Sequence, residues 1–206
     1  MDALNRRTFL AVSGLATSMA SLAAADETRP EPTRAESPYD PSRDPLLLTQ
    51  NPVILKGRDA ALDVLKPKLA DLHHGLELHR QSLVFDTYGF APRAASHRPD
   101  LAALAEAGAS DVEMQDLQEE QGMIRAALVA EERTEFDEAM RTSGVTCIFQ
   151  NAGEEGQDPL QLLKRLARFT VLTDQRRGTL IRATQPEEIL QAKATGRHCL
   201  YLTGNG

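Results

Sequence analysis

From about residue 59 onward, helical patterns alternate with short apolar runs, and this alternation restricts the possible fold more than any other feature. The apolar runs are nearly continuous and too short for helices, which is typical of strands in a buried parallel sheet. Strands are expected at residues 82–86, 145–149, 179–182 and 197–203. We therefore predict an α/β domain of parallel β/α units.

Helices are expected between these strands, where apolar residues recur at steps of three and four. Their predicted ranges are residues 59–80, 100–108, 111–142, 158–171 and 186–196. Pro67 should break the first range, and Asp100 should cap the second. The range 111–142 should divide into two helices, and Gly144 should end the second of them.

Residues 1–25 have the pattern of a twin-arginine signal peptide. Residues 5–10 read Asn-Arg-Arg-Thr-Phe-Leu, an adjacent arginine pair followed by a polar residue and two apolar ones. Residues 11–24 are too short and too polar for a stable membrane span, and Ala23–Ala25 supply small residues for cleavage. An ordinary secretory signal or a chance arginine pair is the alternative. The pattern predicts export by the twin-arginine machinery to the periplasm or cell envelope.

Residues 26–58 are rich in proline and charge, so they are predicted to form an extended tether before a domain at residues 59–206. The chain ends directly after a predicted strand, where a parallel sheet would need a covering helix. This position of the last strand indicates an incomplete domain.

The formal net charge of −7 argues against nucleic acid as a partner, because nucleic-acid binding requires a basic surface. No polybasic stretch is present that would hold an anionic membrane. The expected partner is a small molecule, a peptide or another protein.

Three segments in order resemble the membrane dipeptidase family of zinc metallopeptidases, also called renal dipeptidases. Residues 78–86 read Leu-His-Arg-Gln-Ser-Leu-Val-Phe-Asp, and residues 141–146 read Arg-Thr-Ser-Gly-Val-Thr. Residues 187–197 read Glu-Glu-Ile-Leu-Gln-Ala-Lys-Ala-Thr-Gly-Arg. The similarity runs from about residue 78 to residue 206.

The resemblance implies part of a (β/α)8 barrel of the TIM type. It also implies a pair of zinc ions that activate a water molecule to hydrolyse dipeptides. The first strand of the family ends Asp-Gly-His-x-Asp, and its histidine and second aspartate bind metal. These two positions fall at Tyr88 and Phe90 in this chain, and neither side chain suits zinc. A bridging carboxylate is expected near Gly204 or Asn205, where no glutamate is present.

Asp86 is the one candidate catalytic residue, because it lies at the end of the first predicted strand. Bonding to its local backbone is the alternative role. The five histidines offer less: His73, His74 and His79 lie in a polar helix, His97 in a loop and His198 at the start of a strand.

Cys147 and Cys199 both lie in predicted strands. They are expected to be buried thiols, with a disulfide between neighbouring strands as the alternative in an oxidising compartment.

Three functions stay open. The first is a dipeptidase that is encoded here in part or that uses altered metal ligands. The second is an exported pseudoenzyme or binding module without the metal centre, and the third is a truncated remnant. The absence of the first metal-binding pair leaves enzyme activity undecided.

Overall fold

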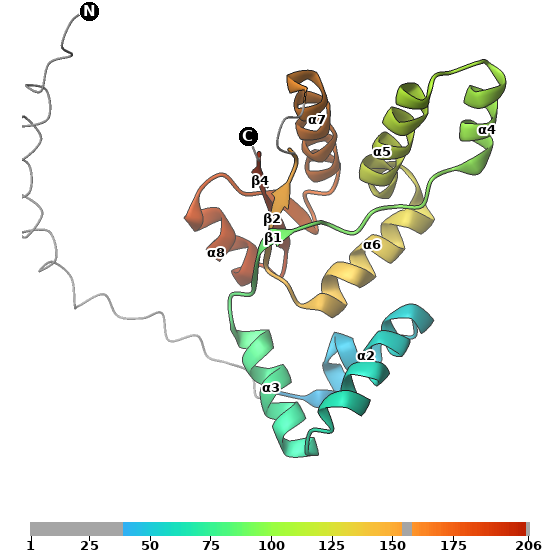
Figure 1. Ribbon diagram of the computed structural model, residues 1–206. Coiled ribbons are helices and arrows are strands. Elements are labelled where there is room, and N and C mark those ends of the chain that lie inside the picture. Colours follow the sequence, from blue (N-terminus) through green and yellow to red (C-terminus); the bar gives the residue numbers. More distant parts are fainter. Residues whose placement is uncertain (1–38, 154–157, 205–206) are drawn as a thin grey trace, which may run out of the picture. The chain divides into compact units, whose positions relative to one another are not determined.

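The computed structural model describes residues 39–153 and 158–204, and the predicted signal peptide lies outside this part of the chain. Helices and parallel strands alternate in it, as the sequence predicts (Figure 1). The helices before the first strand are η1 (Pro41–Arg43), α1 (Pro45–Leu48), α2 (Pro52–Leu65) and α3 (Leu69–Gln81). The later elements are β1 (Phe85–Gly89), α4 (Arg98–Glu106), α5 (Asp111–Leu128), α6 (Ala130–Ser143), β2 (Cys147–Asn151), α7 (Pro159–Gln175), β3 (Leu180–Arg182), α8 (Pro186–Ala194) and β4 (His198–Thr203).

The four strands form one parallel sheet in the order β1-β2-β4-β3. The steps from β1 to β2 and from β2 to β3 run in one direction across the sheet, whereas the step from β3 to β4 runs back. Because crossover connections between parallel strands are right-handed, this reversal places α8 on the opposite face from α5, α6 and α7. Figure 1 shows α8 on one side of the strands and these three helices on the other.

The larger core lies between the sheet and helices α5, α6 and α7. Ile148 and Leu200 point from the sheet toward Phe136, Phe169 and Leu172, and all five side chains are buried. On the other face, a smaller core joins α8 to the amino-terminal halves of β2 and β4.

Local signals explain where several helices begin and end. Ser110 and Glu113 form a capping box at the start of α5, and Asp158 caps α7 by accepting a hydrogen bond from the Leu160 amide. Gly144 ends α6 with φ of 64°. Pro67 follows the end of α2 and separates it from α3, as predicted.

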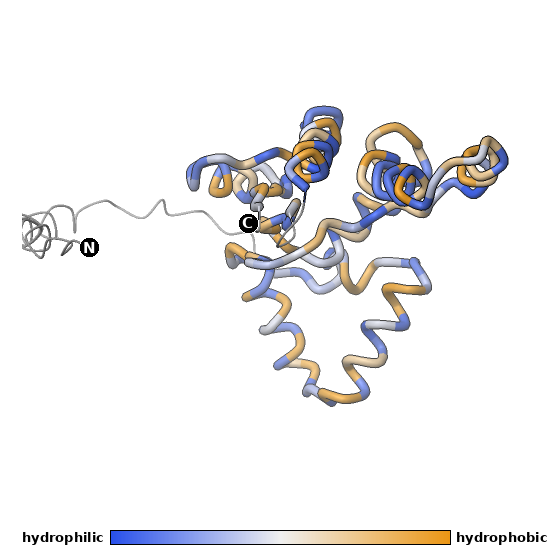
Figure 2. Tube along the Cα trace, turned by 45° about the horizontal axis from the view of Figure 1, so that its top comes forward, coloured by the Kyte–Doolittle hydropathy of each residue, from blue (hydrophilic) through white to orange (hydrophobic). Residues whose placement is uncertain are grey.

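The structure differs from the predicted tether over residues 41–58, which contain η1, α1 and the first half of α2. Asp40, Asp44 and Asn51 each cap one of these helices, and a proline follows each cap at the first helical position. The prolines that suggested an extended chain therefore start helices. Figure 2 shows α2 and α3 as alternating hydrophobic and hydrophilic residues, and no residue of either helix is fully buried.

Asp100 does not cap α4, contrary to the prediction. His97 is the N-cap residue of this helix, and the Asp100 carboxylate lies 3.0 Å from Nδ1 of the His97 ring. The first two strands were predicted to begin at residues 82 and 145. In the structure, β1 begins at Phe85 and β2 at Cys147. No helix in the described ranges is long and apolar enough to cross a membrane.

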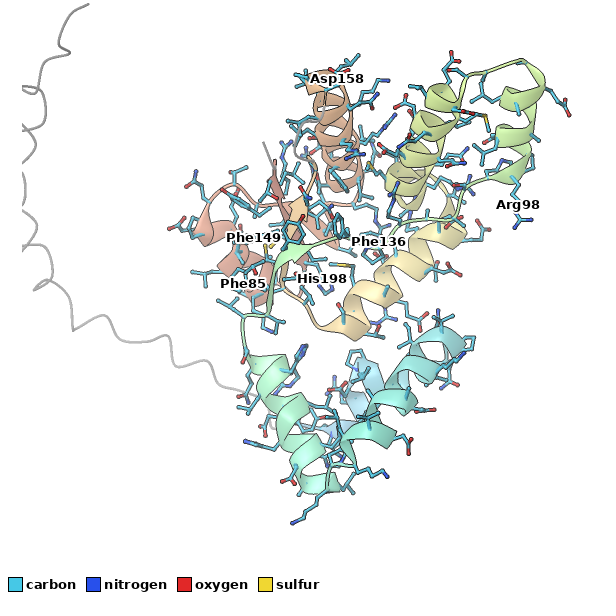
Figure 3. All side chains as sticks on the ribbon, viewed as in Figure 1. Phe85, Arg98, Phe136, Phe149, Asp158 and His198 are labelled. Atoms are coloured by element: carbon cyan, nitrogen blue, oxygen red, sulfur yellow. The ribbon has the colours of Figure 1, made fainter. Side chains whose placement is uncertain are left out.

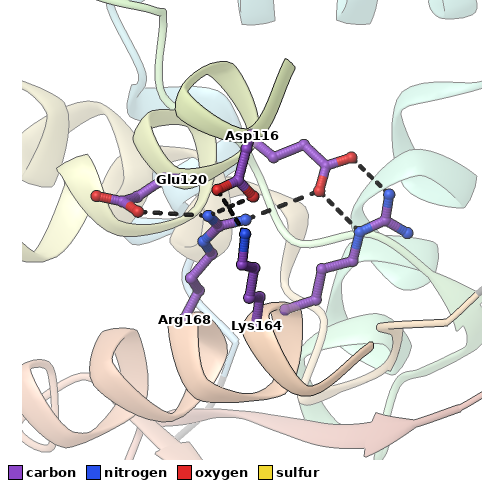
Figure 4. Close-up of polar contacts among 6 residues, drawn as sticks. Asp116, Glu120, Lys164 and Arg168 are labelled. Carbon is purple, nitrogen blue, oxygen red and sulfur yellow. Dashed lines mark hydrogen bonds and ion pairs between the residues drawn. The ribbon is translucent and has the colours of Figure 1, made fainter. Parts of the chain in front are cut away.

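An ionic seam joins α5 to α7 and contains Asp116, Glu119, Glu120, Lys164, Arg165 and Arg168. Figure 4 labels four of these residues, Asp116, Glu120, Lys164 and Arg168. Arg165 binds Glu119 through two hydrogen bonds of 2.9 and 2.5 Å, and Asp116 accepts hydrogen bonds of 2.9 Å from both Lys164 and Arg168. The Arg168 side chain is almost wholly buried. The seam fixes α7 beside α5, so both helices present their apolar faces to the sheet.

The ionic seam should make the protein sensitive to acid. Hydrogen bonds from Arg165 lower the pKa of Glu119, and the pKa of Asp116 is lowered because bonds to Lys164 and Arg168 outweigh its partial burial. A carboxylate with a lowered pKa stabilises the fold above its unfolded pKa, and this contribution is lost as pH falls through the folded value. We expect the free energy of unfolding in urea to fall steeply below about pH 4. Glu119→Gln should lower stability at pH 7 and flatten this dependence; an unchanged slope would contradict the role of the seam.

Candidate functional site

The carboxyl ends of β1, β2 and β4 meet at one edge of the sheet. Gly89 is aligned with Gln150, and Asn151 is aligned with Thr203. Ligands of parallel α/β folds generally bind at this edge, because the loops there are free to carry functional residues. Tyr88 and Phe90 lie at this edge, whereas Asp86 is the second residue of β1 and not its last, contrary to the prediction. This edge is the candidate site.

Asp86 folds back onto its own strand. The register between β1 and β2 shifts between Asp86 and Gly89, and the Asp86 carboxylate accepts a hydrogen bond of 3.2 Å from the Tyr88 amide. A Cβ atom added to Gly89 would lie 2.4 Å from this carboxylate and 2.8 Å from Ile148, so a larger residue there would force these side chains to move. The geometry gives Asp86 the local backbone role that the sequence offered as its alternative.

Tyr88 and Phe90 are exposed aromatic residues at the end of β1. Their side chains are 64% and 62% exposed, and their rings meet edge to face with centroids 6.2 Å apart. The Tyr88 hydroxyl accepts a hydrogen bond of 3.4 Å from the Asn151 amide group. The two residues therefore form an apolar surface with a phenol and a carboxamide at its inner end.

Zinc does not fit this set of side chains. Zinc sites use thiolate, imidazole and carboxylate ligands, whereas Tyr88, Phe90 and Asn151 supply a phenol, a hydrocarbon ring and an amide. Gly204 carries no ligating side chain, and Asn205 lies outside the described residues. Within the described ranges, no group of three histidine, cysteine, aspartate or glutamate side chains is placed to hold a metal ion.

Gln150 holds the loop that follows β1, and this role of Gln150 was not predicted from the sequence. Its buried carboxamide accepts a hydrogen bond of 2.6 Å from the Ala91 amide and donates one of 2.9 Å to the Asn151 carbonyl. On β4, Thr203 donates a hydrogen bond of 3.2 Å to the Gln150 carbonyl. The only sequence signal for this role is a polar residue within an otherwise apolar run. Gln150 thus fixes the direction in which Phe90 leaves the strand.

A row of aromatic rings crosses the sheet on the face that also carries Asn151 and Thr203. Phe85, Phe149 and Tyr201 come from β1, β2 and β4, one from each strand. Ring centroids are 6.0 Å apart for Phe85 and Phe149, and 5.0 Å apart for Phe149 and Tyr201. Figure 3 shows Phe85 and Phe149 on their neighbouring strands. Phe85 and Tyr201 are each more than a third exposed, so the row is an accessible apolar surface leading to the candidate site.

The histidines lie away from this edge. The His198 ring contacts the Val145 carbonyl at the amino end of β4, at a distance of 2.6 Å. His97 begins α4, which packs on α5, and its backbone amide donates a hydrogen bond of 2.6 Å to Gln121. The His79 ring lies against Gly144, before β2. None of these three rings belongs to the candidate site.

A cavity of about 630 Å³ lies on the amino-terminal side of the strands. Its walls include Leu62, Leu72 and Leu76 from α2 and α3, with Arg141 and Lys193 at its rim. Lys193 donates a hydrogen bond of 2.6 Å to the Arg80 carbonyl. The cavity lies away from the carboxyl ends of the strands, so it is separate from the candidate site.

Comparisons with protein-family models, with curated proteins and with solved structures find no match for this chain.

Proposed function

We propose that this chain is an exported binding module that has a dipeptidase-like scaffold and binds a short peptide at the carboxyl edge of its sheet. The observation that carries the proposal is the pair of exposed aromatic residues, Tyr88 and Phe90, at the positions where the resemblance places metal ligands. Aromatic side chains bury large areas at little entropic cost.

The proposed scaffold is part of a (β/α)8 barrel in which β1, β2 and β4 are the first three strands. Parallel pairing of these strands in chain order supports this assignment. β3 occupies the edge of β4 at which a fourth barrel strand would pair. Barrel closure would therefore require β3 to leave that edge.

Zinc-dependent hydrolysis of dipeptides is the family activity that the resemblance implies. The side chains at the candidate site give it no support, because they do not supply the ligands. Calorimetric titration with a dipeptide, run with and without added zinc, separates peptide binding from zinc-dependent hydrolysis.

The test is calorimetric titration of the purified chain with an apolar dipeptide such as alanyl-phenylalanine. We expect weak binding, with Kd between about 10 µM and 1 mM. Tyr88→Ala and Phe90→Ala should each weaken it about tenfold or more, because buried aromatic anchors dominate binding energies.

Leu163→Ala is the matched control, since Leu163 on α7 is 63% exposed and lies on another element. Equal affinity of all four proteins would contradict binding at the candidate site. Dipeptide cleavage that requires added zinc would overturn the binding module in favour of the metallopeptidase.

A further inference from the structure

Cys147 and Cys199 are direct neighbours in the sheet. They are aligned register partners at the amino-terminal ends of β2 and β4, so their side chains point to the same face. Both residues are 0% exposed and both thiols are free. The Cys199 thiol donates a hydrogen bond of 3.4 Å to the Thr146 carbonyl.

The two thiols lie in the small core beneath α8. Ala183, Ile189 and Ala192 surround them, and all three side chains are buried. The hydrogen bond with Cys147 and burial both raise the pKa of Cys199, whereas that same bond lowers the pKa of Cys147.

We propose that Cys147 and Cys199 are a redox pair that forms a reversible disulfide between β2 and β4. Neighbouring strands are about 4.8 Å apart, within the range of Cα separations that disulfides span. The Cβ atoms need to approach by about 1 Å to reach their usual separation in a disulfide. The inference is independent of peptide binding, because these residues lie at the opposite end of their strands from the candidate site.

The oxidant is a disulfide, either of a small thiol compound or of a protein oxidant. The Cys147 thiolate attacks one sulfur of that disulfide, displaces the other as a thiolate and forms a mixed disulfide. The Cys199 thiolate then attacks the Cys147 sulfur and displaces the remaining part of the oxidant as a second thiolate. Two cysteine thiols are oxidised, their two protons pass to the two displaced thiolates, and the oxidant is thereby reduced to two thiols.

Access to the pair requires α8 to leave the sheet, because this helix covers both sulfur atoms. α8 has nine residues, and only Ile189 and Ala192 of these are buried. Short elements with few buried side chains open more readily than the rest of a domain. The disulfide should form quickly during folding, before α8 docks, and slowly in the folded protein.

The test is refolding of the reduced full-length chain in buffers with graded ratios of oxidised to reduced glutathione. Samples are then denatured in acid, alkylated and analysed by mass spectrometry. We expect a monomer that has lost two hydrogen atoms, takes up no alkylating agent and yields a linked peptide pair containing Cys147 and Cys199. Half-oxidation should require a glutathione ratio about tenfold or more lower in native buffer than in urea, because folding holds the thiols together.

Cys147→Ser and Cys199→Ser are matched controls, and each should leave one thiol that is alkylated after denaturation. Two alkylated thiols in the wild-type monomer would overturn the proposal, as would disulfide-linked dimers alone. Equal glutathione ratios for half-oxidation in native buffer and in urea would also overturn it.

Discussion

Replacement of both Arg6 and Arg7 by lysine is expected to abolish export of the chain in a bacterium that has twin-arginine machinery. Lysine keeps the positive charge but lacks the planar guanidinium group, so a receptor that recognises the arginine pair should not bind it. Fractionation of cells followed by immunoblotting measures the result. Nearly all of the wild-type chain should be found outside the cytoplasm, and nearly all of the double variant should stay inside.

Arg43→Lys combined with Arg177→Lys is the matched control, because both arginines are exposed in the folded domain. This control should be exported like the wild type. If the Arg6 and Arg7 double variant is exported normally, the segment is an ordinary secretory signal. If the wild-type chain and the Arg43 and Arg177 control both stay in the cytoplasm, the proposed export is wrong.

Leu172→Ala should lower the free energy of unfolding by about 2–5 kcal/mol. Leu172 is 1% exposed on α7 and lies in the larger core with Phe169 and Leu200, so truncation leaves a cavity that the sheet cannot fill. Urea denaturation followed by circular dichroism measures the change. The midpoint should fall while the dependence on urea concentration stays the same.

Leu163→Ala on the same helix is the control for this prediction, because Leu163 is exposed. Its effect should stay within about 0.5 kcal/mol. Equal losses from the two variants would show that α7 packs on the sheet through a different face.

The alternation of helices and parallel strands could be predicted because it depends on local sequence patterns. The helix break at Pro67, the start of α7 at Asp158 and the end of α6 at Gly144 were correctly identified from single residues with strong conformational preferences. The strand order could not be predicted in this way. It depends on β3 pairing with the far edge of β4, and no nearby residue specifies that contact.

The predicted strand ends were less accurate, because they also depend on contacts between residues far apart in the sequence. Residues 82–84 are partly apolar, but the ladder between β1 and β2 begins only at Phe85, opposite Cys147. The tether prediction failed over residues 41–58 because proline after Asp40, Asp44 or Asn51 favours a helix start as well as an extended chain.

The candidate site was predicted in part. Tyr88 and Phe90 lie at the carboxyl end of β1, as predicted, whereas Asp86 is the second residue of this strand and not its last. The contact between Tyr88 and Asn151, and the role of Gln150, could not be predicted because they follow from the shifted register between two strands 58 residues or more apart.

The turn that Asp86 makes with Tyr88 also affects how this sheet meets other chains. β1 is an outer strand of the sheet, and an outer strand with unpaired backbone groups can recruit a strand from another molecule. β1 has only five residues, and its register with β2 shifts between Asp86 and Gly89. Within this irregular stretch, the Asp86 carboxylate accepts a hydrogen bond from the Tyr88 amide. The turn in which Asp86 accepts a hydrogen bond from the Tyr88 amide therefore makes this outer strand a poor template for aggregation.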